Sequence, residues 1–256
     1  LTFEPMPKMY FNKNIKNFRI SNQMQKIDLL KNFNVDFVIT KKFNKEFSKT
    51  KSDDFIKKIL VKKLNAKFIF VSNNFRFGNK REGNVKQLIK NGSLFNYKIV
   101  KPKPLLIKKK IVSSSLIRGY LQKGKLREAN KLLNRNWSIQ GNVQKGKQIG
   151  KKIGFPTANI DIKDTILARP GVYAVKAKIH KSEKYFKGIA NLGYRPTFNG
   201  KKILLEVHLF NFSRNLYYKH LTVKFLKFIR KEIKFKNADH LKKQIRKDLL
   251  VAKKTK

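Results

Sequence analysis

Apolar side chains follow two different periods in the two halves of this chain of 256 residues. In the first half, short continuous apolar runs alternate with stretches in which apolar residues recur every three or four positions. This alternation predicts strands joined by crossover helices, as in a parallel α/β sheet. We expect buried strands at 35–39 and 68–71, a further strand at 97–100, and helices that begin at Ser52 and near Asn84.

In the second half, apolar residues recur every two positions, which is the period of a β-strand with one buried face. Two such sets are Tyr173, Val175, Ala177 and Ile179, and Leu205, Val207 and Leu209. Gly and Pro residues stand between these runs, where turns are needed. We therefore predict a small antiparallel β-barrel, closed by a helix that follows Asn237. The predicted domains are 1–122 for the α/β part, 123–137 for a helical linker and 138–256 for the barrel.

Composition excludes several kinds of protein. The chain has no Cys and only four His, so neither a disulfide framework nor a thiolate zinc site can form. Apolar residues make up 41% of the chain, which is enough for folded cores. No run approaches the roughly 20 apolar residues of a membrane span, so we expect no membrane partner. A reducing, cytoplasmic setting fits these features best.

The formal net charge is +47, a value that ordinarily indicates binding to nucleic acid. The lysines, however, are spread over nearly every polar position instead of being clustered. We therefore expect a solvated basic surface and no nucleic-acid partner. The alternative is a basic barrel that binds single-stranded nucleic acid, which would require Phe and Tyr side chains exposed on one strand face.

The segment 146–159 carries the most informative motif. Its three glycines, Gly146, Gly150 and Gly154, let the backbone approach phosphate oxygens and direct N–H groups at them. Lys151 and the neighbouring lysines would supply counter-charge. The segment is not a Walker A loop, because a proline follows the last glycine by two positions and keeps the chain extended. The alternative is a glycine-rich hairpin beside a proline turn.

Two oxygen-bearing side chains follow these glycines. Thr157 and Asn159 lie two positions apart, so on an extended chain their hydroxyl and amide oxygens face the same side. Oxygen donors in this arrangement can share one Mg²⁺ ion, which makes both residues candidate metal ligands.

The segment 146–159 resembles the signature of the riboflavin kinase family. Further blocks in the same order resemble that family at 171–174, 191–197, 205–209, 216–217 and 225–232, so that the likeness spans roughly 138–250. The resemblance implies a six-stranded barrel that transfers the γ-phosphate of ATP to riboflavin and yields FMN. One departure is Lys151, where the family often has Arg, because lysine keeps the charge but loses the bidentate fork.

By its position in the Glu-Val-His block, the resemblance implies that Glu206 is the catalytic base. On an extended strand Glu206 shares one face with Leu204, His208 and Phe210, and we expect His208 to pack or hydrogen-bond rather than take part in the chemistry. The alternative is a glutamate on the solvent face of a strand. Two more residues, Arg230 and Glu232, follow the last predicted strand and are candidates to border the flavin.

The first half resembles the adenylyltransferase module of the bacterial bifunctional enzyme that makes FMN and then FAD, a Rossmann-like nucleotidyltransferase fold. Residues 2–7 resemble its Thr-Phe-Glu-Pro-His-Pro block, with Met6 in place of the His. The loop at Asn74, Phe75 and Arg76 resembles its flavin-side loop. Ser113, Ser114 and Arg118 resemble an element in which hydroxyls and a helix N-terminus hold a triphosphate, although serines before a helix are also common N-caps.

The resemblance also implies a Gly-x-Phe-Asp-Gly-x-His-x-Gly-His motif in the first strand and loop, and nothing like it precedes Thr2. We therefore expect an incomplete α/β domain, and no conversion of FMN to FAD by the chain as given. The alternative is an intact bifunctional FAD synthetase of which this sequence is a part. The sequence leaves the oligomeric state open.

Overall fold

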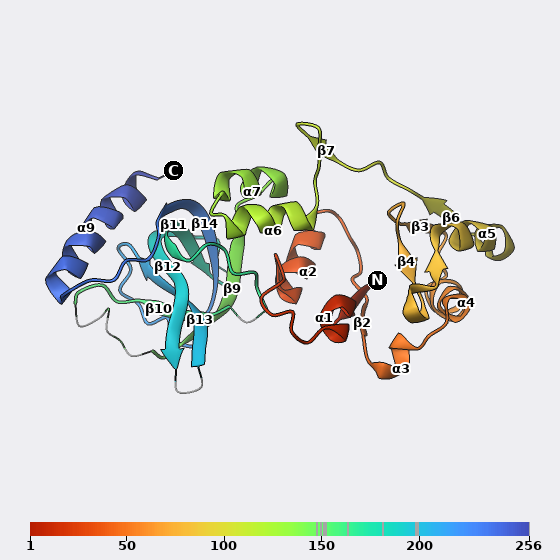
Figure 1. Ribbon diagram of the computed structural model, residues 1–256, viewed down its shortest axis with the longest axis horizontal. Coiled ribbons are helices and arrows are strands. Elements are labelled where there is room, and N and C mark those ends of the chain that lie inside the picture. The colour runs from red at the N-terminus through yellow and green to blue at the C-terminus, as the bar shows by residue number, and fades with distance from the viewer. Residues whose placement is uncertain are drawn as a thin grey trace. The chain divides into compact units, whose positions relative to one another are not determined.

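The computed structural model describes residues 1–146, 148, 150, 153–162, 164–180, 182–197 and 200–255. The chain forms two compact units (Figure 1): unit 1 comprises Leu1–Ile15 and Asp36–Ile111, and unit 2 comprises Lys16–Val35 and Val112–Lys256. Unit 2 therefore includes a short N-terminal segment besides the barrel. The ranges 1–122, 123–137 and 138–256 stay a prediction of domain organisation.

Unit 1 combines short strands with helices. Its elements are β1 (Thr2–Glu4), α1 (Pro7–Phe11), β2 (Thr40–Lys42), α3 (Lys45–Ser48), α4 (Ser52–Asp54), the π-helix η1 (Phe55–Lys63), β3 (Phe68–Phe70), β4 (Arg76–Phe77), η2 (Asn79–Arg81), β5 (Gly83–Asn84), α5 (Val85–Phe95), β6 (Lys98–Val100), β7 (Leu106–Ile107) and β8 (Lys110–Ile111). Strands β1 and β2 pair in parallel, as do β3 and β6. The core of the unit gathers around Ile56 and Leu88, which are fully buried. The predicted α/β architecture is confirmed.

Two details of the predicted strands in unit 1 are wrong. The run 35–39 is not a strand, and Val35, Phe37 and Ile39 are 37%, 85% and 48% exposed. The chain passes from unit 2 to unit 1 within this run, and strand β2 begins directly after it, at Thr40. Strand β3 does form, but Phe68 and Phe70, which share one face of it, are exposed, and among the described residues β3 pairs only with β6.

Unit 2 is built on a closed barrel. Its elements are α2 (Gln23–Lys31), α6 (Ser114–Gln122), α7 (Leu126–Leu133), β9 (Ser138–Gln144), β10 (Ala158–Asp161), β11 (Gly171–Ile179), β12 (Phe186–Thr197), β13 (Gly200–Leu209), β14 (His220–Arg230) and α9 (Ala238–Lys254). The strands follow the order β10-β13-β12-β11-β14-β9, and β9 pairs with β10 to close the barrel. All pairs are antiparallel, so the predicted six-stranded barrel is confirmed.

The apolar side chains at every second position of the barrel strands fill the barrel interior. Tyr173 and Val175 on β11, and Leu205 and Val207 on β13, are at most 1% exposed and belong to one core. Trp137 is also fully buried, and its Nε1 donates to the carbonyl of Ile20 at 2.9 Å, which ties the N-terminal segment to the barrel. Side chains between these positions therefore point outward.

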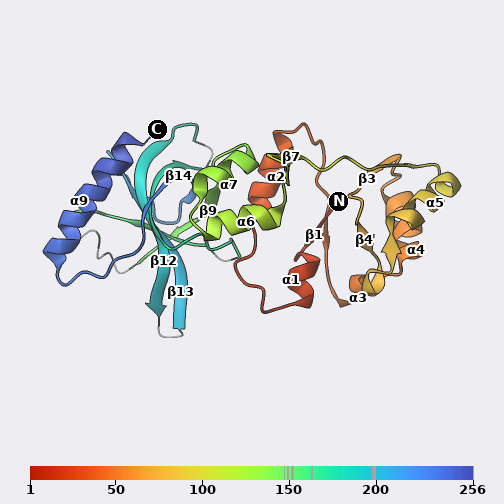
Figure 2. The same cartoon turned by 45° about the horizontal axis from the view of Figure 1, so that its top comes forward.

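Helices flank the barrel on two sides (Figures 1 and 2): α2, α6 and α7 lie beside β9, and α9 lies on the opposite flank. Helix α9 begins after Asn237, whose side chain accepts a hydrogen bond from the backbone N–H of His240. Its apolar residues Leu249 and Ala252 pack on the outer face of the barrel. Among the helices described, none is long and apolar enough to cross a membrane.

Candidate active site

A pocket of about 600 Å³ lies on the outer face of the barrel, where four strands meet the glycine-rich segment and α9. Its size suits a ligand such as a nucleotide or a cofactor. The side chains that line it come from the segment 146–159, from β11 to β14, from residues 232–235 and from α9, and they include Thr157, Asn159, Asn191, Arg195, Glu206, His208, Arg230, Glu232, Leu241, Ile245 and Asp248. The pocket thus collects most of the kinase residues that the sequence predicts.

Sheet register brings three polar side chains into one line, which we call the polar row: Asn159, Glu206 and Asn191. Asn159 on β10 is the direct cross-strand partner of Glu206 on β13, and Glu206 is the partner of Asn191 on β12. Directly opposite residues in antiparallel strands have Cβ atoms about 5 Å apart and face the same side. Because Leu205 and Val207 point into the barrel, Glu206 points outward into the pocket.

The glycines of the motif lie against this row. A Cβ atom at Gly146 would collide with the side-chain amide of Asn159, and one at Gly150 would collide with the carbonyl of Phe155 and lie 3.3 Å from the Thr157 hydroxyl. Gly154 has φ +89°, a backbone conformation that favours glycine. The glycines therefore permit the close approach of this segment to Thr157 and Asn159. Lys151, with Lys147 and Lys152, lies outside the described residues.

His208 holds the far end of the same segment. Its Nδ1 donates to the carbonyl of Pro156 at 2.8 Å, and its ring meets the edge of Phe155 at 5.9 Å between centroids. His208 is the next residue after Glu206 on the same strand face, and it thereby fixes the chain just before Thr157. The contacts give His208 a structural task, in keeping with the expectation from the sequence.

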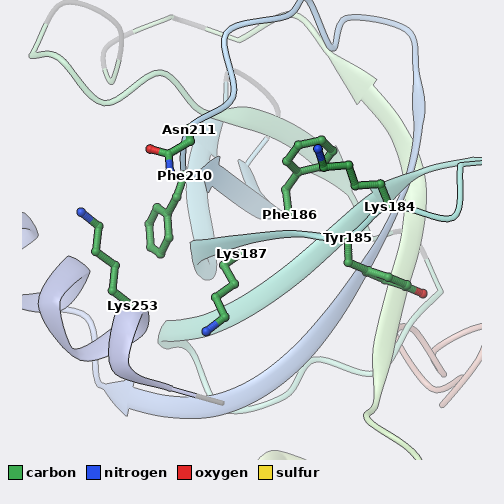
Figure 3. A pocket seen from close by; sticks show the side chains of 7 residues that line it. All are labelled: Lys184, Tyr185, Phe186, Lys187, Phe210, Asn211 and Lys253. Atoms are coloured by element: carbon green, nitrogen blue, oxygen red, sulfur yellow. The ribbon is translucent and has the colours of Figure 1, made fainter.

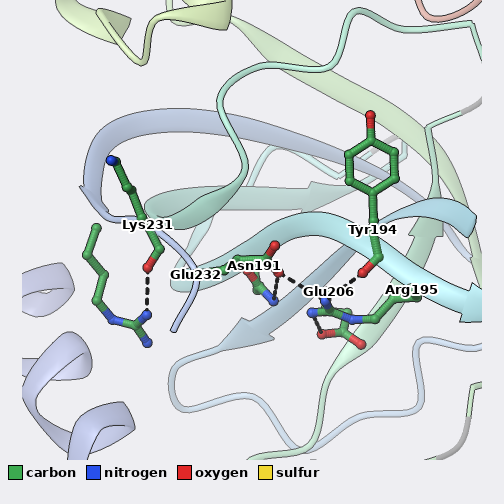
Figure 4. A network of polar contacts seen from close by, with 7 residues as sticks. Asn191, Tyr194, Arg195, Glu206, Lys231 and Glu232 are labelled. Atoms are coloured by element: carbon green, nitrogen blue, oxygen red, sulfur yellow. Dashed lines mark hydrogen bonds and ion pairs between the residues drawn. The ribbon is translucent and has the colours of Figure 1, made fainter. Parts of the chain in front are cut away.

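Arg195 joins two carboxylates of the pocket (Figure 4). Its Nη2 donates to Oε2 of Glu206 at 2.7 Å, and its Nη1 donates to Oε1 of Glu232 at 3.0 Å. Burial alone lowers the pKa of the Arg195 guanidinium, but the hydrogen bonds and negative charges of Glu206 and Glu232 outweigh that effect, and the net pKa is raised. Asn191 donates to the same Glu232 oxygen at 3.3 Å. The guanidinium is therefore a fixed cation between two acids.

The side chain of Arg230 forms an ion pair with helix α9. Its Nη2 lies 2.7 Å from Oδ2 of Asp248, its Nε donates to the same carboxylate, and Asp248 is 3% exposed. Gln244 donates to the other carboxylate oxygen at 2.9 Å. This buried ion pair pins α9 to the end of β14, so that Leu241 and Ile245 form an apolar wall of the pocket.

The candidates for adenylyl transfer fall into both units. In unit 1, Asn74 accepts a hydrogen bond from the Ser72 hydroxyl at 3.0 Å, Phe75 stacks on Phe77 with 5.7 Å between centroids, and Arg76 is exposed on β4. These residues form a loop and hairpin beside the start of α5. The site residues from the Ser113 element lie in unit 2.

Within unit 2, Ser113 is the N-cap of α6 and accepts from the backbone N–H of Leu116 at 3.2 Å, while Ser114 is the first residue of that helix. Arg118 donates from Nε to the carbonyl of Phe18 at 2.9 Å, and its guanidinium stacks 3.7 Å from the Phe18 ring. Burial lowers the pKa of Arg118. In this structure the Ser113 side chain caps the helix and the Arg118 side chain packs on Phe18.

Sequence reasoning did not single out Arg195, Asn191 or Asp248 as site residues. Arg195 and Asn191 are four apart on one strand, so the period of two places both on the face opposite to Leu192. That signal is present in the sequence, but their contacts with Glu206 depend on the pairing of β12 with β13, which no local pattern reveals.

Comparison with known proteins agrees with this geometry. Residues 133–256 match the family model described as riboflavin kinase, and residues 1–116 match the model described as FAD synthetase. The chain is 43% identical to the bifunctional riboflavin kinase/FMN adenylyltransferase of Buchnera aphidicola subsp. Schizaphis graminum, with 99% of this chain and 82% of the relative covered. The enzyme of the same name from Haemophilus influenzae is 40% identical, with coverage of 99% and 82%.

A solved structure described as a macrolide-efflux protein from Streptococcus pneumoniae superposes with a TM-score of 0.83 at 27% identity, covering 99% of this chain and 82% of that one. The name of that protein differs from those of the sequence relatives, whereas the fold is shared along nearly the whole chain. The two sequence relatives carry the same name, and the two family models match the two halves of the chain. The pocket lies in the part of the chain that the riboflavin kinase model covers. The chain therefore belongs to the family of bifunctional riboflavin kinase/FMN adenylyltransferases.

Proposed function

We propose that unit 2 is a riboflavin kinase that transfers the γ-phosphate of ATP to the 5′-hydroxyl of riboflavin, giving FMN and ADP. The observation that carries this proposal is the polar row, because it sets the candidate base Glu206 directly beside Asn159 in one pocket. The match of residues 133–256 to riboflavin kinases supports the same reaction. In phosphoryl transfer, positioning and charge neutralisation supply most of the rate, and the register of the polar row provides the positioning.

The glycine-rich segment would cradle the phosphates of ATP. A Cβ atom at Gly146 or Gly150 would collide with the Asn159 amide or with the carbonyl of Phe155, so glycine lets this segment lie close to Asn159 and Thr157. A backbone without side chains at these positions can direct its N–H groups at phosphate oxygens. Gly154 completes the turn in its left-handed conformation. We assign Lys151 a charge-neutralising task on the basis of the sequence.

Thr157 and Asn159 fit the oxygen ligands that Mg²⁺ prefers. Both line the pocket, and Asn159 is 8% exposed, so its amide is held by its surroundings. Among the described residues, no group of three or more His, Cys, Asp or Glu could hold a metal ion. Two neutral oxygens suit Mg²⁺ when it is bound mainly through phosphates and water. When bound, the ion would neutralise charge on the phosphates.

Glu206 would accept the proton of the riboflavin hydroxyl as the new O–P bond forms and the bond between the γ-phosphorus and the leaving ADP oxygen breaks. Arg195 holds Oε2 of Glu206, and this leaves Oε1 as the oxygen to receive the proton. Since Glu232 holds Arg195 from the other side, the base is fixed through two charged contacts. Arg195 is in this account a positioning residue.

Arg230 and Glu232 would border the flavin. They lie where the pocket meets its apolar wall of Ile233, Leu241 and Ile245, and a planar aromatic ring system needs such a wall on at least one face. Because Arg230 is bonded to Asp248, its contribution is to place the wall.

The reaction is tested by chromatography of the flavin products. Purified protein should convert riboflavin to FMN with ATP and Mg²⁺, and excess chelator should abolish the conversion. Thr157→Ala should raise the KM for MgATP and lower kcat, and Thr157→Ser, which keeps the hydroxyl, should retain most of the activity. FMN formation that proceeds equally well in chelator would contradict the metal role of Thr157 and Asn159.

For unit 1 we propose a part in the adenylylation of FMN to FAD. The match of residues 1–116 to FAD synthetases supports it, as does the exposed Arg76 beside the stacked rings of Phe75 and Phe77. The test is flavin binding: titration with FMN should reveal a second flavin site that Arg76→Ala weakens while the kinase reaction is unchanged. Loss of kinase activity in that variant would speak against an assignment to unit 1.

A further inference from the structure

A second hollow, of about 530 Å³, lies on the outside of the barrel and shares no lining residue with the pocket described above. It is formed where the start of β12, the end of β13 and the end of α9 meet (Figure 3). We call it the outer hollow. It is lined by Lys184, Tyr185, Phe186, Lys187, Phe210, Asn211 and Lys253. Lysines and aromatic rings make up nearly all of this lining.

The lysines stand over the rings of the outer hollow. Nζ of Lys253 lies 5.9 Å from the centroid of Phe210, and Nζ of Lys184 lies 5.3 Å from that of Phe186. Figure 3 shows Phe210 between Lys253 and Lys187. A flat ligand that displaces the flexible lysine from the face of such a ring would keep the ammonium group at its own edge.

Three lysines continue from the hollow across the sheet, and we call them the lysine row: Lys187, Lys176 and Lys224. Lys176 on β11 is the direct cross-strand partner of Lys187 on β12 and also of Lys224 on β14. Like charges directly opposite one another destabilise a sheet. A row of three such charges is therefore a costly feature, and an anion laid along it would remove the cost.

The ring of Tyr185 gathers the ammonium groups beside the row. Nζ of Lys224 lies 4.4 Å from its centroid, and those of Lys178 and Lys176 lie 5.4 and 5.5 Å away. Of the described residues that line the hollow, none carries a carboxylate. Glu183 lies 4.0 Å from Lys178 but is 97% exposed, so that solvent screens the pair.

We propose that the outer hollow and the lysine row bind single-stranded nucleic acid, with a base stacked on Phe210 and successive phosphates along the lysines. Neighbouring strands are about 4.8 Å apart, so a row across three strands extends about 10 Å, which is longer than a single phosphate group. Aromatic platforms beside a basic track are the combination that holds single strands, and every base has a face that can stack. A basic surface that only contacts solvent would not need aromatic rings among its lysines.

The test is the fluorescence anisotropy of a labelled 12-mer of oligouridylate, titrated with the whole chain at several salt concentrations. Replacing the lysine row with glutamine (K176Q, K187Q and K224Q together) should weaken binding at least tenfold at low salt. The slope of log K against log salt should fall by about 2, because each phosphate that a lysine neutralises adds about 0.7 to it. The matched control replaces Lys62, Lys63 and Lys67, which are exposed lysines of unit 1, and should change affinity by less than about twofold.

Phe210→Leu provides the second variant, because leucine keeps the apolar packing against the barrel and removes the stacking ring. It should weaken binding about fivefold and leave the salt slope unchanged. Melting temperature and riboflavin kinase activity, measured on all variants, verify folding. Equal losses in the two lysine triples, or tighter binding of a duplex of the same length, would overturn the proposal.

Discussion

The two units of the chain use β-structure in opposite ways. In unit 2 every strand of the barrel has two neighbours, and a single core fills the interior. In unit 1 the strands are two or three residues long and pair off in twos, and Phe68 and Phe70 stay 62% and 67% exposed. Closure gives the barrel fixed register along whole strands, whereas the pairs of unit 1 fix only a few positions.

This difference decides where chemistry can be precise. The residues that line the active-site pocket all lie between 146 and 248, within unit 2, and three of them are aligned by register alone. The candidates of unit 1 lie on a loop and at the start of a two-residue strand. We therefore expect that changes in the barrel wall affect the kinase reaction strongly, and that comparable changes in unit 1 do not.

The largest effect is expected for Glu206→Gln, which keeps the shape and one acceptor oxygen but cannot take the proton. Removal of a positioned base should lower kcat by roughly 10²–10⁴-fold, at least about 2.7 kcal/mol of barrier. Steady-state kinetics with riboflavin and MgATP measure it, with Glu183→Gln, an exposed carboxylate of the same unit, as the control. Turnover within a few-fold of the parent in the folded variant would show that Glu206 is only a surface carboxylate.

Breaking one ion pair in each unit compares how much a buried pair and an exposed pair contribute to the free energy of unfolding. Asp248→Asn breaks the buried pair with Arg230 and should cost about 3 kcal/mol of unfolding free energy. Asp54→Asn in unit 1 breaks the exposed pair with Lys58, at 3.1 Å, and should cost less than about 0.5 kcal/mol. Denaturant unfolding measures both. Similar costs for the two substitutions would mean that α9 is not held by Asp248.

A smaller effect is expected for the positioning residue Arg195. Arg195→Met removes the cation that holds Glu206, so kcat should fall about tenfold while the KM for riboflavin changes little. Arg195→Lys should recover only part of kcat, because lysine keeps the charge but lacks the two-pronged guanidinium that contacts both Glu206 and Glu232. An unchanged kcat in the folded Arg195→Met variant would remove Arg195 from the mechanism.

The smallest effect is a pH dependence confined to the barrel unit. Burial, together with the charge of His180, lowers the pKa of His220 below 6.5, while Asp28 acts in the opposite direction. Its Nδ1 lies 2.8 Å from Oδ1 of Asn142. Since the unfolded chain then takes up the proton first, the contribution of His220 is present above about pH 6.5 and is lost as the pH falls through its folded value.

The melting temperature should therefore fall between pH 7.5 and 5.5, and less steeply in His220→Gln. His240→Gln, at an exposed position near the start of α9, is the control and should melt as the parent does. If His220→Gln and the parent lose stability in parallel, His220 does not contribute to the dependence.

Elements whose signals are local were predictable from the sequence. The helix near Asn84 forms because the Asn84 side chain accepts from the backbone N–H of Gln87 at 3.0 Å, a cap that the sequence shows. The barrel strands were predictable because alternation of period two persists over whole strands. The predicted strand at 35–39 was wrong because an exposed connection rich in apolar residues has the same pattern as a buried strand.

Contacts between distant segments could not be predicted in this way. Glu206 was found through resemblance and strand face, but its bonds to Arg195 depend on which residues of β12 and β13 face each other. The same holds for Asp248, which lies 18 positions from its partner Arg230 and looks in sequence like one more charge on a solvated helix.

The polar row has one more consequence, which concerns insertions and deletions. Adding or removing one residue within β13 before Glu206 would exchange the inward and outward sides of the strand, bringing Leu205 into the pocket and the carboxylate into the dry interior. Because the barrel is closed, such a slip cannot be absorbed at a free edge and would have to run through every neighbouring pair. Residues in the barrel wall can therefore be substituted, whereas the number of residues in β13 before Glu206 must stay constant so that Glu206 faces the pocket.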